Sequence, residues 1–372
     1  MRLLILSAKT GGGHEMRARA LTELASSLGF ETHTIRPLEE GSIIDRFGSN
    51  LYNWIQKFYP RLHRFYFGFL EFASLHRKTS TILSEKKMRQ EVTGFSPDLV
   101  ISVHAHLNHG FRDLIIEELE GDAKPKFVVY CGELADGIGY SRHWINPMVD
   151  EFWGPFSDCI GAAIKKGMPK SKCHVMGPLL RSHFYEMPAD AQVKEFILKY
   201  DFSLDDDIVL LGTGANGVQN HIKASKSLLN NSFRGQIAAL CSSKRIKSQL
   251  TQMAQHSGPM IKPLSILDSR EMSILTYLSS WIYGRPGAGL TTESLVANKP
   301  MIFDINGGLM PQEENNLNFW RENCQSLTIA RRPEELGLLS DKILPPFRKR
   351  KQFSPRKILD RLSLLRKERY GG

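Results

Sequence analysis

The sequence predicts an α/β fold of two domains, each an open parallel sheet flanked by helices. At 372 residues the chain has the length of about two or three ordinary domains. Short apolar runs, each followed by turn residues and a helical pattern, occur in two successive series separated by a stretch that contains Pro178 and Pro188. This alternation is typical of parallel sheets, whose ligands bind at the carboxyl ends of the strands. We therefore expect two domains that face each other across a ligand-binding cleft.

The strands are predicted from these apolar runs. In the first series residues 2–7 precede a glycine cluster, and apolar residues then recur every four positions from Met16 to Leu28. Gly29 ends that helix, and further strands are predicted at 31–35, 99–103 and 127–131. The second series has strands at 208–211, 237–241, 280–283 and 301–303. We assign residues 1–178 to an N-terminal domain, 179–340 to a C-terminal domain and 341–372 to a basic helical tail.

The net charge of +10 is concentrated in two segments. Residues 46–89 contain nine Lys and Arg against two acids, and residues 342–369 contain eleven against two, so the rest of the chain carries −6. Such a distribution favours an anionic partner: nucleic acid, an anionic membrane or a phosphorylated substrate. The apolar content of 41% excludes a disordered chain.

The first basic segment is also rich in aromatic residues at helical spacing. Its apolar residues recur every three or four positions, interrupted by Pro60, beside a stripe of cations. One interpretation is a helix that buries its aromatic face in the core. The other is a surface helix that inserts aromatic rings into lipid while its cations contact anionic headgroups. Base stacking on nucleic acid is a third, which no recognised motif supports. The residues expected at the acceptor or membrane surface are Trp54, Phe58, Arg61, Arg64 and Phe65.

The second basic segment predicts a final helix. Ser354 is typical of a helix N-cap, and Pro355 is typical of the first helical position. Ile358, Leu362 and Leu365 then form an apolar stripe. We expect this helix to dock on the protein, with a second membrane contact as the alternative.

The cysteines and the apolar runs indicate the compartment. The five cysteines are at least 14 positions apart and form no C-x-x-C, so neither a disulfide framework nor a four-thiolate zinc site is expected. The run at residues 3–6 is too short for a signal peptide, and no stretch approaches the roughly 18 apolar residues of a membrane span. We expect a cytoplasmic protein, soluble or peripherally associated with the membrane.

A glycine motif, TGGGH at residues 10–14, directly follows the first strand. Gly12 and Gly13 let the backbone approach a substrate closely, and the helix that follows offers its N–H groups to an anion. No Gly-Lys-Ser/Thr follows, so this is not a P-loop. His14 falls on the first helical turn, where it is a candidate general base. The alternative is a histidine that only caps or packs.

A second glycine motif, G-x-G-x-x-G at residues 212–217, includes Gly214, Ala215 and Asn216. A dinucleotide site would need an acid about 20 residues later, at the end of the next strand. Lys244 and Arg245 follow that strand instead, which leaves NADP as an alternative. The motif opens the second domain, a position that suits a loop at the interdomain cleft.

Two further motifs follow later strands of the second domain. Residues 285–293, RPGAGLTTE, place glycines before a helix whose N-terminus suits a diphosphate, and Glu293 suits both ribose hydroxyls of a nucleotide. Polar residues that open the next helix, from Pro311, suit sugar hydroxyls. A purely structural role for either motif is the alternative. The donor-binding candidates, with Gly12 and Gly13, are Arg285, Gly287, Ala288, Gly289, Thr291, Glu293, Gln312, Glu313 and Asn316.

The segment HAHLNH at residues 104–109 approximates the H-x-H-x-D-H pattern of metal-dependent hydrolases. The spacing suits imidazole ligation, but Asn108 replaces the acid, and His174 and His183 have no evident acidic companion. We therefore expect no metal and interpret these side chains as polar cleft residues, with His104 on the acceptor side.

With these motifs in this order, the sequence resembles the GT-B glycosyltransferases of the monogalactosyldiacylglycerol synthase type, which are family 28-like, and is close to bacterial processive diacylglycerol glucosyltransferases. It looks more distantly like the peptidoglycan N-acetylglucosaminyltransferase. The match extends from about residue 2 to 335. It rests on residues 10–14, Gly177, Pro178 and Arg181, the loop from Gly212, Gly287, Gly289 and Glu293, and Gln312, Glu313 and Asn316.

The resemblance implies a GT-B fold, with two Rossmann-like domains facing across a cleft. The N-terminal domain would face acceptor and membrane, and the C-terminal domain would bind the UDP-sugar. The implied reaction is an inverting transfer of galactose or glucose to a lipid such as diacylglycerol at an anionic membrane surface. The UDP-sugar is the donor substrate, and no further cofactor is required. His14, or a carboxylate such as Glu133, would take the acceptor proton. No nucleic acid is expected as a partner, and the oligomeric state stays open.

Three departures concern the sugar and the acceptor rather than the fold. Glu133 stands where many relatives have Asp, Leu290 replaces a small residue or Thr, and about two extra residues precede Gln312. The alternative function is therefore transfer to a different acceptor, or a reaction of the UDP-N-acetylglucosamine epimerase kind. A basic nucleic-acid-binding protein would leave the glycine loops unused.

Overall fold

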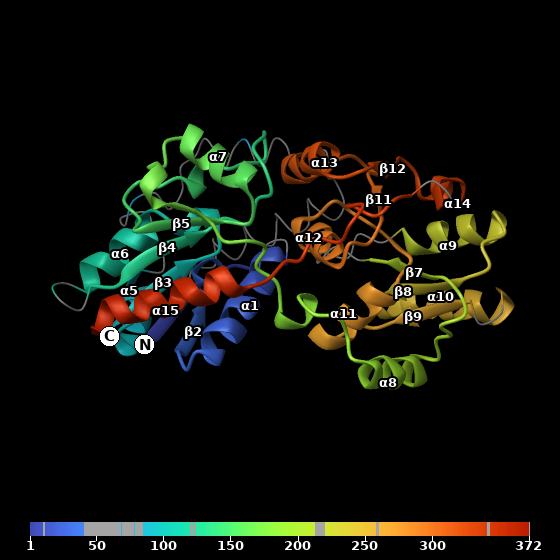
Figure 1. The fold of residues 1–372 in the computed structure, drawn as a ribbon, viewed down its shortest axis with the longest axis horizontal. Helices are drawn as coiled ribbons and strands as arrows, with labels where there is room; N and C mark the ends of the chain where they lie inside the picture. The colour runs from blue at the N-terminus through green and yellow to red at the C-terminus, as the bar shows by residue number, and fades with distance from the viewer. Residues whose placement is uncertain are drawn as a thin grey trace. The chain divides into compact units, whose positions relative to one another are not determined.

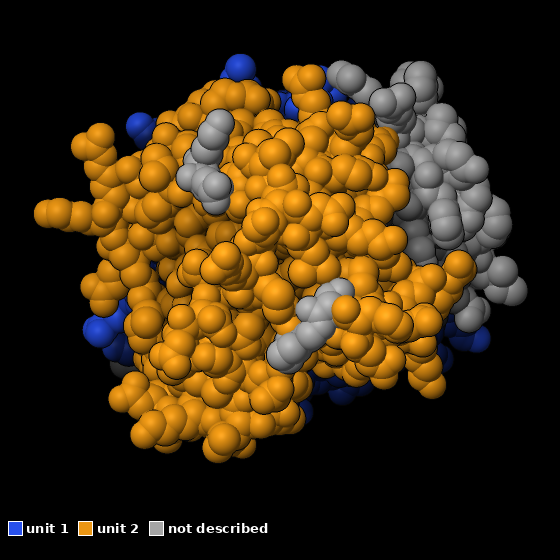
Figure 2. All heavy atoms as spheres, turned by 90° about the vertical axis from the view of Figure 1, so that its right-hand side faces the viewer, with its two compact units in different colours: residues 1–182, 310–315, 353–372 blue, residues 183–309, 316–352 orange. Residues whose placement is uncertain are grey.

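The chain forms two compact units (Figure 1, Figure 2). Unit 1 comprises residues 1–182, 310–315 and 353–372, and unit 2 comprises residues 183–309 and 316–352. The structure, a computed structural model, describes residues 1–9, 12–40, 68, 78, 85–119, 121, 124–212, 220–257, 260–340 and 343–371. The expected membrane residues Trp54, Phe58, Arg61, Arg64 and Phe65, and the loop residues Gly214, Ala215 and Asn216, lie outside the described residues.

Unit 1 is built on a parallel sheet of six strands in the order β2-β1-β3-β4-β5-β6. In register, Leu3 of the first strand lies between Thr32 and Leu99 of its two neighbours. The central strands are apolar and almost fully buried because helices cover both faces of a parallel sheet. The strands are β1 (Arg2–Leu6), β2 (Glu31–Ile35), β3 (Leu99–Ser102), β4 (Lys126–Tyr130), β5 (Glu151–Gly154) and β6 (Cys173–Val175).

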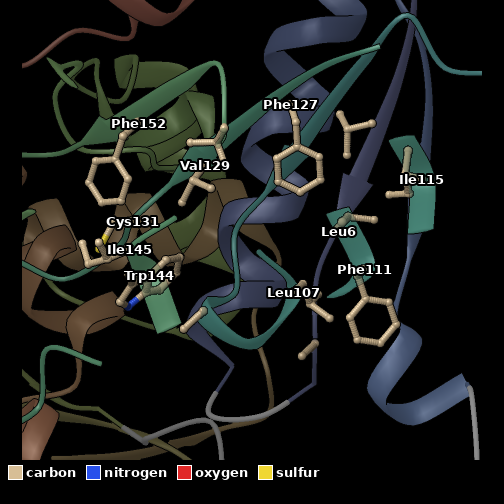
Figure 3. Close-up of a cluster of buried hydrophobic side chains, with 14 of the residues drawn as sticks. Leu6, Leu107, Phe111, Ile115, Phe127, Val129, Cys131, Trp144, Ile145 and Phe152 are labelled. Atoms are coloured by element: carbon tan, nitrogen blue, oxygen red, sulfur yellow. The ribbon is translucent and has the colours of Figure 1, made fainter. Parts of the chain in front are cut away.

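The helices of unit 1 are α1 (Gly13–Ser27), α2 (Pro37–Glu40), α5 (Glu85–Phe95), α6 (Gly110–Glu118), α7 (Ser157–Lys165) and α15 (Arg356–Tyr370). Successive strand residues point to opposite faces of the sheet and enter two separate cores. Leu4 and Leu6 belong to one core. Figure 3 shows Leu6 in this core together with the rings of Phe111, Phe127, Trp144 and Phe152. Leu3 packs in the other core with residues of α1 and α15.

Unit 2 has a second parallel sheet of six strands, in the order β12-β11-β10-β7-β8-β9. Its strands are β7 (Ile208–Leu211), β8 (Gln236–Leu240), β9 (Ile261–Leu264), β10 (Trp281–Gly284), β11 (Met301–Asp304) and β12 (Thr328–Ala330). Its helices are α8 (Asp190–Tyr200), α9 (His221–Asn230), α10 (Lys244–Ser257), α11 (Ser269–Leu278), α12 (Ala288–Ala297), α13 (Pro311–Asn323) and α14 (Leu336–Leu339); the first turn of α13 is counted with unit 1.

This architecture confirms the predicted α/β fold of two parallel sheets. Four strands, β5, β6, β9 and β12, were not predicted. β6 and β12 are three-residue edge strands that are partly exposed, so they lack the apolar run of a central strand. β9 contains Pro263, which an edge strand tolerates because one side of its backbone needs no partner.

Each sheet has a point where the strand order reverses, and ligands of such sheets bind in the crevice at that point. In unit 1 the reversal lies between β1 and β3, because β1 is flanked by β2 on one side and by β3 on the other. In unit 2 it lies between β7 and β10. We therefore expect ligand-binding residues in the segments that follow β1, β3, β7 and β10.

Helix α15 is the last element of unit 1 (Figure 1). Its residues Ile358, Leu362 and Leu365 are buried in the core that contains Leu3. At its start, Ser354 Oγ accepts a hydrogen bond of 3.1 Å from the Arg356 backbone N–H. Across the described ranges, no helix has the length and apolar character needed to cross a membrane.

Candidate functional site

His14 lies at the reversal point of unit 1, on the first turn of α1. The chain enters this helix through Gly12, whose φ of 66° is in the left-handed region that favours glycine. The His14 Nδ1 atom lies 2.7 Å from the Val103 carbonyl oxygen, at the end of β3. Because a carbonyl only accepts, Nδ1 carries the proton and Nε2 keeps its lone pair. Burial, followed by the charge of Arg17, lowers the pKa of His14 to about 3, although the bond to Val103 opposes this change.

Glu133 follows β4, the neighbour of β3 in the same sheet. Burial raises the pKa of its carboxyl group to about 7. The charge of Arg17 and a hydrogen bond from the Trp144 side chain act in the opposite direction. A carboxyl group with a pKa near the working pH is suited to general base catalysis.

Arg17 connects these two groups, and sequence reasoning missed it. Arg17 is only 7% exposed, and its Nη2 donates a 2.8 Å hydrogen bond to the Gly132 carbonyl. A Cβ atom on Gly132 would lie 1.9 Å from Arg17 Cζ, so any larger residue at this position would displace the guanidinium. The spacing of residues along the chain provided one indication that Arg17 is buried. It precedes Leu21 and Leu24 by four and seven positions, so it lies on the buried face of α1.

A row of histidine rings extends from His14. The ring centroids of His14 and His104 are 4.5 Å apart, those of His104 and His106 are 5.7 Å apart, and those of His106 and His143 are 4.5 Å apart. His104 Nδ1 accepts a hydrogen bond of 3.3 Å from the His106 backbone N–H, which places the His104 ring proton on Nε2. No group of three or more His, Cys, Asp or Glu with a metal-binding arrangement occurs in the part of the chain that the structure describes.

The second group of candidates lies in unit 2, after β10. Arg285 is buried, and its guanidinium donates to the carbonyls of Asn306, at 2.9 Å, and Gly308, at 2.7 Å, which ties it to the turn after β11. Gly287 is the N-cap of α12 and provides no side-chain cap. A Cβ on Gly287 would meet no atom of the described residues within 4 Å, so these residues leave open space before the first turn of α12. Such a helix N-terminus favours an anion.

Two polar residues of α12 that follow its first turn are buried. Glu293 is 4% exposed and Thr291 is fully buried. Within the described residues, Thr291 Oγ1 has no hydrogen-bond partner. Ala288 and Gly289 form the first turn itself. A buried hydroxyl without a partner is unfavourable, so this position is better satisfied when a polar ligand is bound.

The residues that open α13 do not all lie in one unit. Asn316 Nδ2 donates a 2.8 Å hydrogen bond to the Pro286 carbonyl within unit 2, which joins α13 to the loop before α12. Glu313 Oε2 accepts from the Met310 backbone N–H at 3.0 Å and caps its own helix. Gln312 and Glu313 are counted with unit 1. In that unit, Asn315 Oδ1 accepts a 3.3 Å hydrogen bond from the Gly139 backbone N–H.

Asn220 and Asp304 are further polar residues at the strand ends of unit 2 that sequence reasoning missed. Asn220 Nδ2 donates to Asp304 Oδ2 at 2.7 Å, and Asp304 Oδ1 accepts from the Asn306 backbone N–H at 2.9 Å. Asp304 ends β11, and Asn220 precedes α9. The position of Asp304 at the carboxyl end of β11 was the available signal.

Comparison with known proteins supports the resemblance. The chain is 23% identical over 353 residues to a processive diacylglycerol beta-glucosyltransferase of Bacillus subtilis, which covers 91% of this chain and 87% of that protein. It is 23% identical over 361 residues to monogalactosyldiacylglycerol synthase 1 of Arabidopsis thaliana, which covers 90% of this chain and 63% of that protein. No protein-family model matches the chain. The similarity to these two kinds of enzyme, expected from the motifs, is confirmed.

Solved structures agree on the fold. MurG of Acinetobacter baumannii matches with a TM-score of 0.51 and 12% identity, over 99% of this chain and 95% of that one. A UDP-GlcNAc 2-epimerase of Methanocaldococcus jannaschii, in complex with UDP-GlcNAc and UDP, matches with a TM-score of 0.54 and 13% identity, over 98% of this chain and 100% of that one. At these identities the likeness bears on the fold alone, and the GT-B fold is confirmed.

Proposed function

We propose that this chain is a glycosyltransferase that moves a hexose from a UDP-sugar to a lipid acceptor such as diacylglycerol. The similarity to diacylglycerol glycosyltransferases over about nine-tenths of the chain supports the reaction class. Two features, one in each unit, carry the proposal. Unit 1 holds an acid–base group, His14 and Glu133, and unit 2 holds an uncapped helix N-terminus with buried polar residues behind it.

In this proposal unit 2 binds the donor. The first turn of α12 receives the diphosphate of UDP, as helix N-termini do for anions, and Thr291 donates its hydroxyl to the same ligand. Glu293 accepts hydrogen bonds from the ribose hydroxyls. Arg285 lies two residues before the N-cap of this helix and is tied by two backbone carbonyls to the turn after β11, and its charge stabilises the departing diphosphate. Asn316, which is tied to the loop before α12, contacts the sugar. No cofactor is needed for this chemistry.

The proposed transfer inverts the anomeric carbon in a single displacement. A base in unit 1 takes the proton of the acceptor hydroxyl, and the hydroxyl oxygen bonds to the anomeric carbon. The bond between that carbon and the diphosphate breaks, and its electron pair leaves with UDP. His104 supports the acceptor beside His14, 4.5 Å away between ring centroids.

The acceptor is proposed to be reached from an anionic membrane surface through residues 46–72. The basic and aromatic pattern of that segment supports this step. Vesicle flotation tests it: replacement of Trp54, Phe58 and Phe65 by Ser should abolish binding to anionic vesicles. Replacement of the exposed Leu198 and Leu204 in unit 2 by Ser is the matched control and should leave binding unchanged. Unchanged binding of the triple variant would contradict the membrane contact.

The reaction itself is tested with UDP-glucose, UDP-galactose and UDP-N-acetylglucosamine, each with diacylglycerol vesicles. We expect UDP release and a glycolipid from at least one donor, and loss of both in Glu293→Gln. An epimerase would convert UDP-N-acetylglucosamine in the absence of vesicles. Incubation without vesicles therefore distinguishes an epimerase from a glycosyltransferase. No glycolipid and no UDP release from any donor would overturn the proposal.

A further inference from the structure

Arg17 is a buried cation that contacts the backbone beside one candidate base and lies one helical turn from the other. His14 and Arg17 are both on α1, three positions apart. The Arg17 guanidinium donates to the carbonyl of Gly132, and Glu133 is the next residue. The peptide that carries Glu133 is therefore fixed by Arg17, and the space for this contact exists only because residue 132 has no side chain.

The charge of Arg17 acts on both neighbours in the same direction. It lowers the pKa of His14, as burial also does, and it opposes the rise in the pKa of Glu133 that burial causes. Both effects follow from a positive charge that favours a carboxylate and disfavours an imidazolium. Among the described residues, the Trp144 side chain donates a hydrogen bond to Glu133, and the pKa of the Cys131 thiol is raised mainly by burial and also by the charge of Glu133.

The two aromatic rings described next to His14 do not act as bases for the proton of the acceptor hydroxyl. His104 lies at 4.5 Å and Trp144 at 6.3 Å between ring centroids. The His104 proton is on Nε2, so His104 faces its surroundings as a donor. A neutral His14 presents a lone pair at Nε2, which suits a hydrogen bond from the acceptor hydroxyl but holds a full proton poorly.

We propose that Arg17 is a positioning residue that keeps Glu133 ionised and oriented, so that Glu133 is the base that takes the acceptor proton while neutral His14 orients the hydroxyl. This inference rests on the proposed transfer reaction. In the step, the acceptor O–H bond breaks and its proton goes to a Glu133 carboxylate oxygen. The acceptor oxygen forms the new bond to the anomeric carbon, and UDP leaves with the electron pair of the bond that breaks.

The test is the pH dependence of the transfer rate in Arg17→Gln and Arg17→Lys. Loss of the charge should move the midpoint of the acidic limb upward by about one pH unit or more, because Glu133 then ionises at higher pH. Lys should restore part of the difference, since it returns the charge without the bond geometry of the guanidinium. Arg19→Gln is the matched control: Arg19 is on the same helix, its side chain is 69% exposed, and the midpoint should not move.

A structural role alone would lower the rate of Arg17→Gln equally at every pH, and an unmoved midpoint would overturn the inference. Gly132→Ala is a second variant for the case in which Arg17→Gln does not fold. It keeps the charge but displaces the guanidinium, so the midpoint should again rise.

Glu133 ionisation can also be followed without turnover, which separates this inference from the proposed function. Trp144 donates to Glu133, so its fluorescence should titrate with that carboxyl group, and Trp144→Phe identifies its share of the signal. A higher midpoint in Arg17→Gln, with no transfer in the wild type, would reject the reaction and keep the role of Arg17. An identical midpoint in the two proteins would reject the role of Arg17.

Discussion

The guanidinium of Arg361 in the last helix binds the carboxylate of Glu151 on β5. Its Nε atom lies 3.0 and 2.9 Å from the two Glu151 oxygens, and Nη2 also donates to Glu151. The Glu151 side chain is buried, and it accepts a further 2.7 Å hydrogen bond from Trp153 Nε1. Farther along the helix, Arg369 pairs with Asp98 at 3.4 Å, and Tyr370 donates to the same carboxylate. Part of the positive charge of the C-terminal tail is therefore used inside unit 1.

Removal of Arg361 should destabilise the protein. Burial by itself raises the pKa of Glu151, but the bonds from Arg361 and Trp153 bring it below the ordinary value. Arg361→Gln leaves this carboxylate without its cation, and we expect a loss of about 3 kcal/mol in the free energy of unfolding at pH 7. The wild-type advantage should shrink as the pH falls and Glu151 becomes protonated. Urea denaturation measures both effects.

Arg356→Gln is the control for this loss. Arg356 lies on the same helix and pairs with Asp360, but both side chains are largely exposed, so a change below about 1 kcal/mol is expected. Equal stability of the Arg356 and Arg361 variants would show that the bond to Glu151 does not hold the last helix.

Glu133 predicts a stability change with the opposite dependence on pH. Its pKa is about 7 in the folded protein, above the ordinary 4.5, so between these values the folded state holds a proton that the unfolded state has lost. Stability contributed by this group is therefore present below about pH 4.5 and is lost as the pH rises to 7. Glu133→Gln should be more stable than the wild type at pH 8 by about 2 kcal/mol and nearly equal to it at pH 4.5.

Urea unfolding at both pH values measures this difference. The contribution of His14 to stability rises with pH, because burial lowers its pKa. His14 is present in both proteins, so the difference between their free energies of unfolding does not contain its contribution. A constant difference between variant and wild type at the two pH values would contradict the buried state of Glu133.

Two adjacent glycines of the first motif should differ in their tolerance of alanine. Gly12 has a φ of 66°, and a side chain there is strained by about 1–2 kcal/mol. Gly13 lies in the helix, and a Cβ would make an ordinary contact of 3.5 Å with Arg17. Gly12→Ala should therefore lose stability and displace His14, with a matching loss of transfer. Gly13→Ala should be close to the wild type in stability. Thermal unfolding and the transfer assay compare them, and equal losses would contradict the strain argument.

The fold was predictable where a strand is apolar on both faces, as β1, β3 and β7 are. It was not predictable where burial depends on the tertiary environment, as in β5, which carries the buried Glu151 that is compensated by Arg361, 210 positions later. The same limit applies to the site. His14 was visible because a glycine motif marks it, whereas the role of Arg17 depends on the missing side chain of Gly132, 115 positions away. His104 joins His14 because β1 and β3 are neighbours in the sheet.

Thr291 and Thr292 are adjacent buried threonines of α12 that should respond differently to valine. Thr292 Oγ1 donates to the Ala288 carbonyl at 2.5 Å, so its hydroxyl is satisfied within the helix. Thr291 Oγ1 has no partner in the described part of the chain. In Thr291→Val the unsatisfied hydroxyl is removed at constant shape, and the unliganded protein should be as stable as the wild type or more stable. If Thr291 donates to UDP, the same variant should bind UDP about 10-fold more weakly, because a hydrogen bond to a charged group is worth about 1.5–3 kcal/mol.

Thr292→Val should show the reverse pattern, with a loss of about 1 kcal/mol in stability and unchanged affinity for UDP. Calorimetric titration measures the affinity of each variant for UDP, and thermal unfolding measures the stability of each variant. Wild-type affinity in Thr291→Val would remove this hydroxyl from the proposed donor site. A loss of affinity in both variants would mean that α12 responds to any change in its first turns, so the pair distinguishes a direct contact from a general effect on the helix.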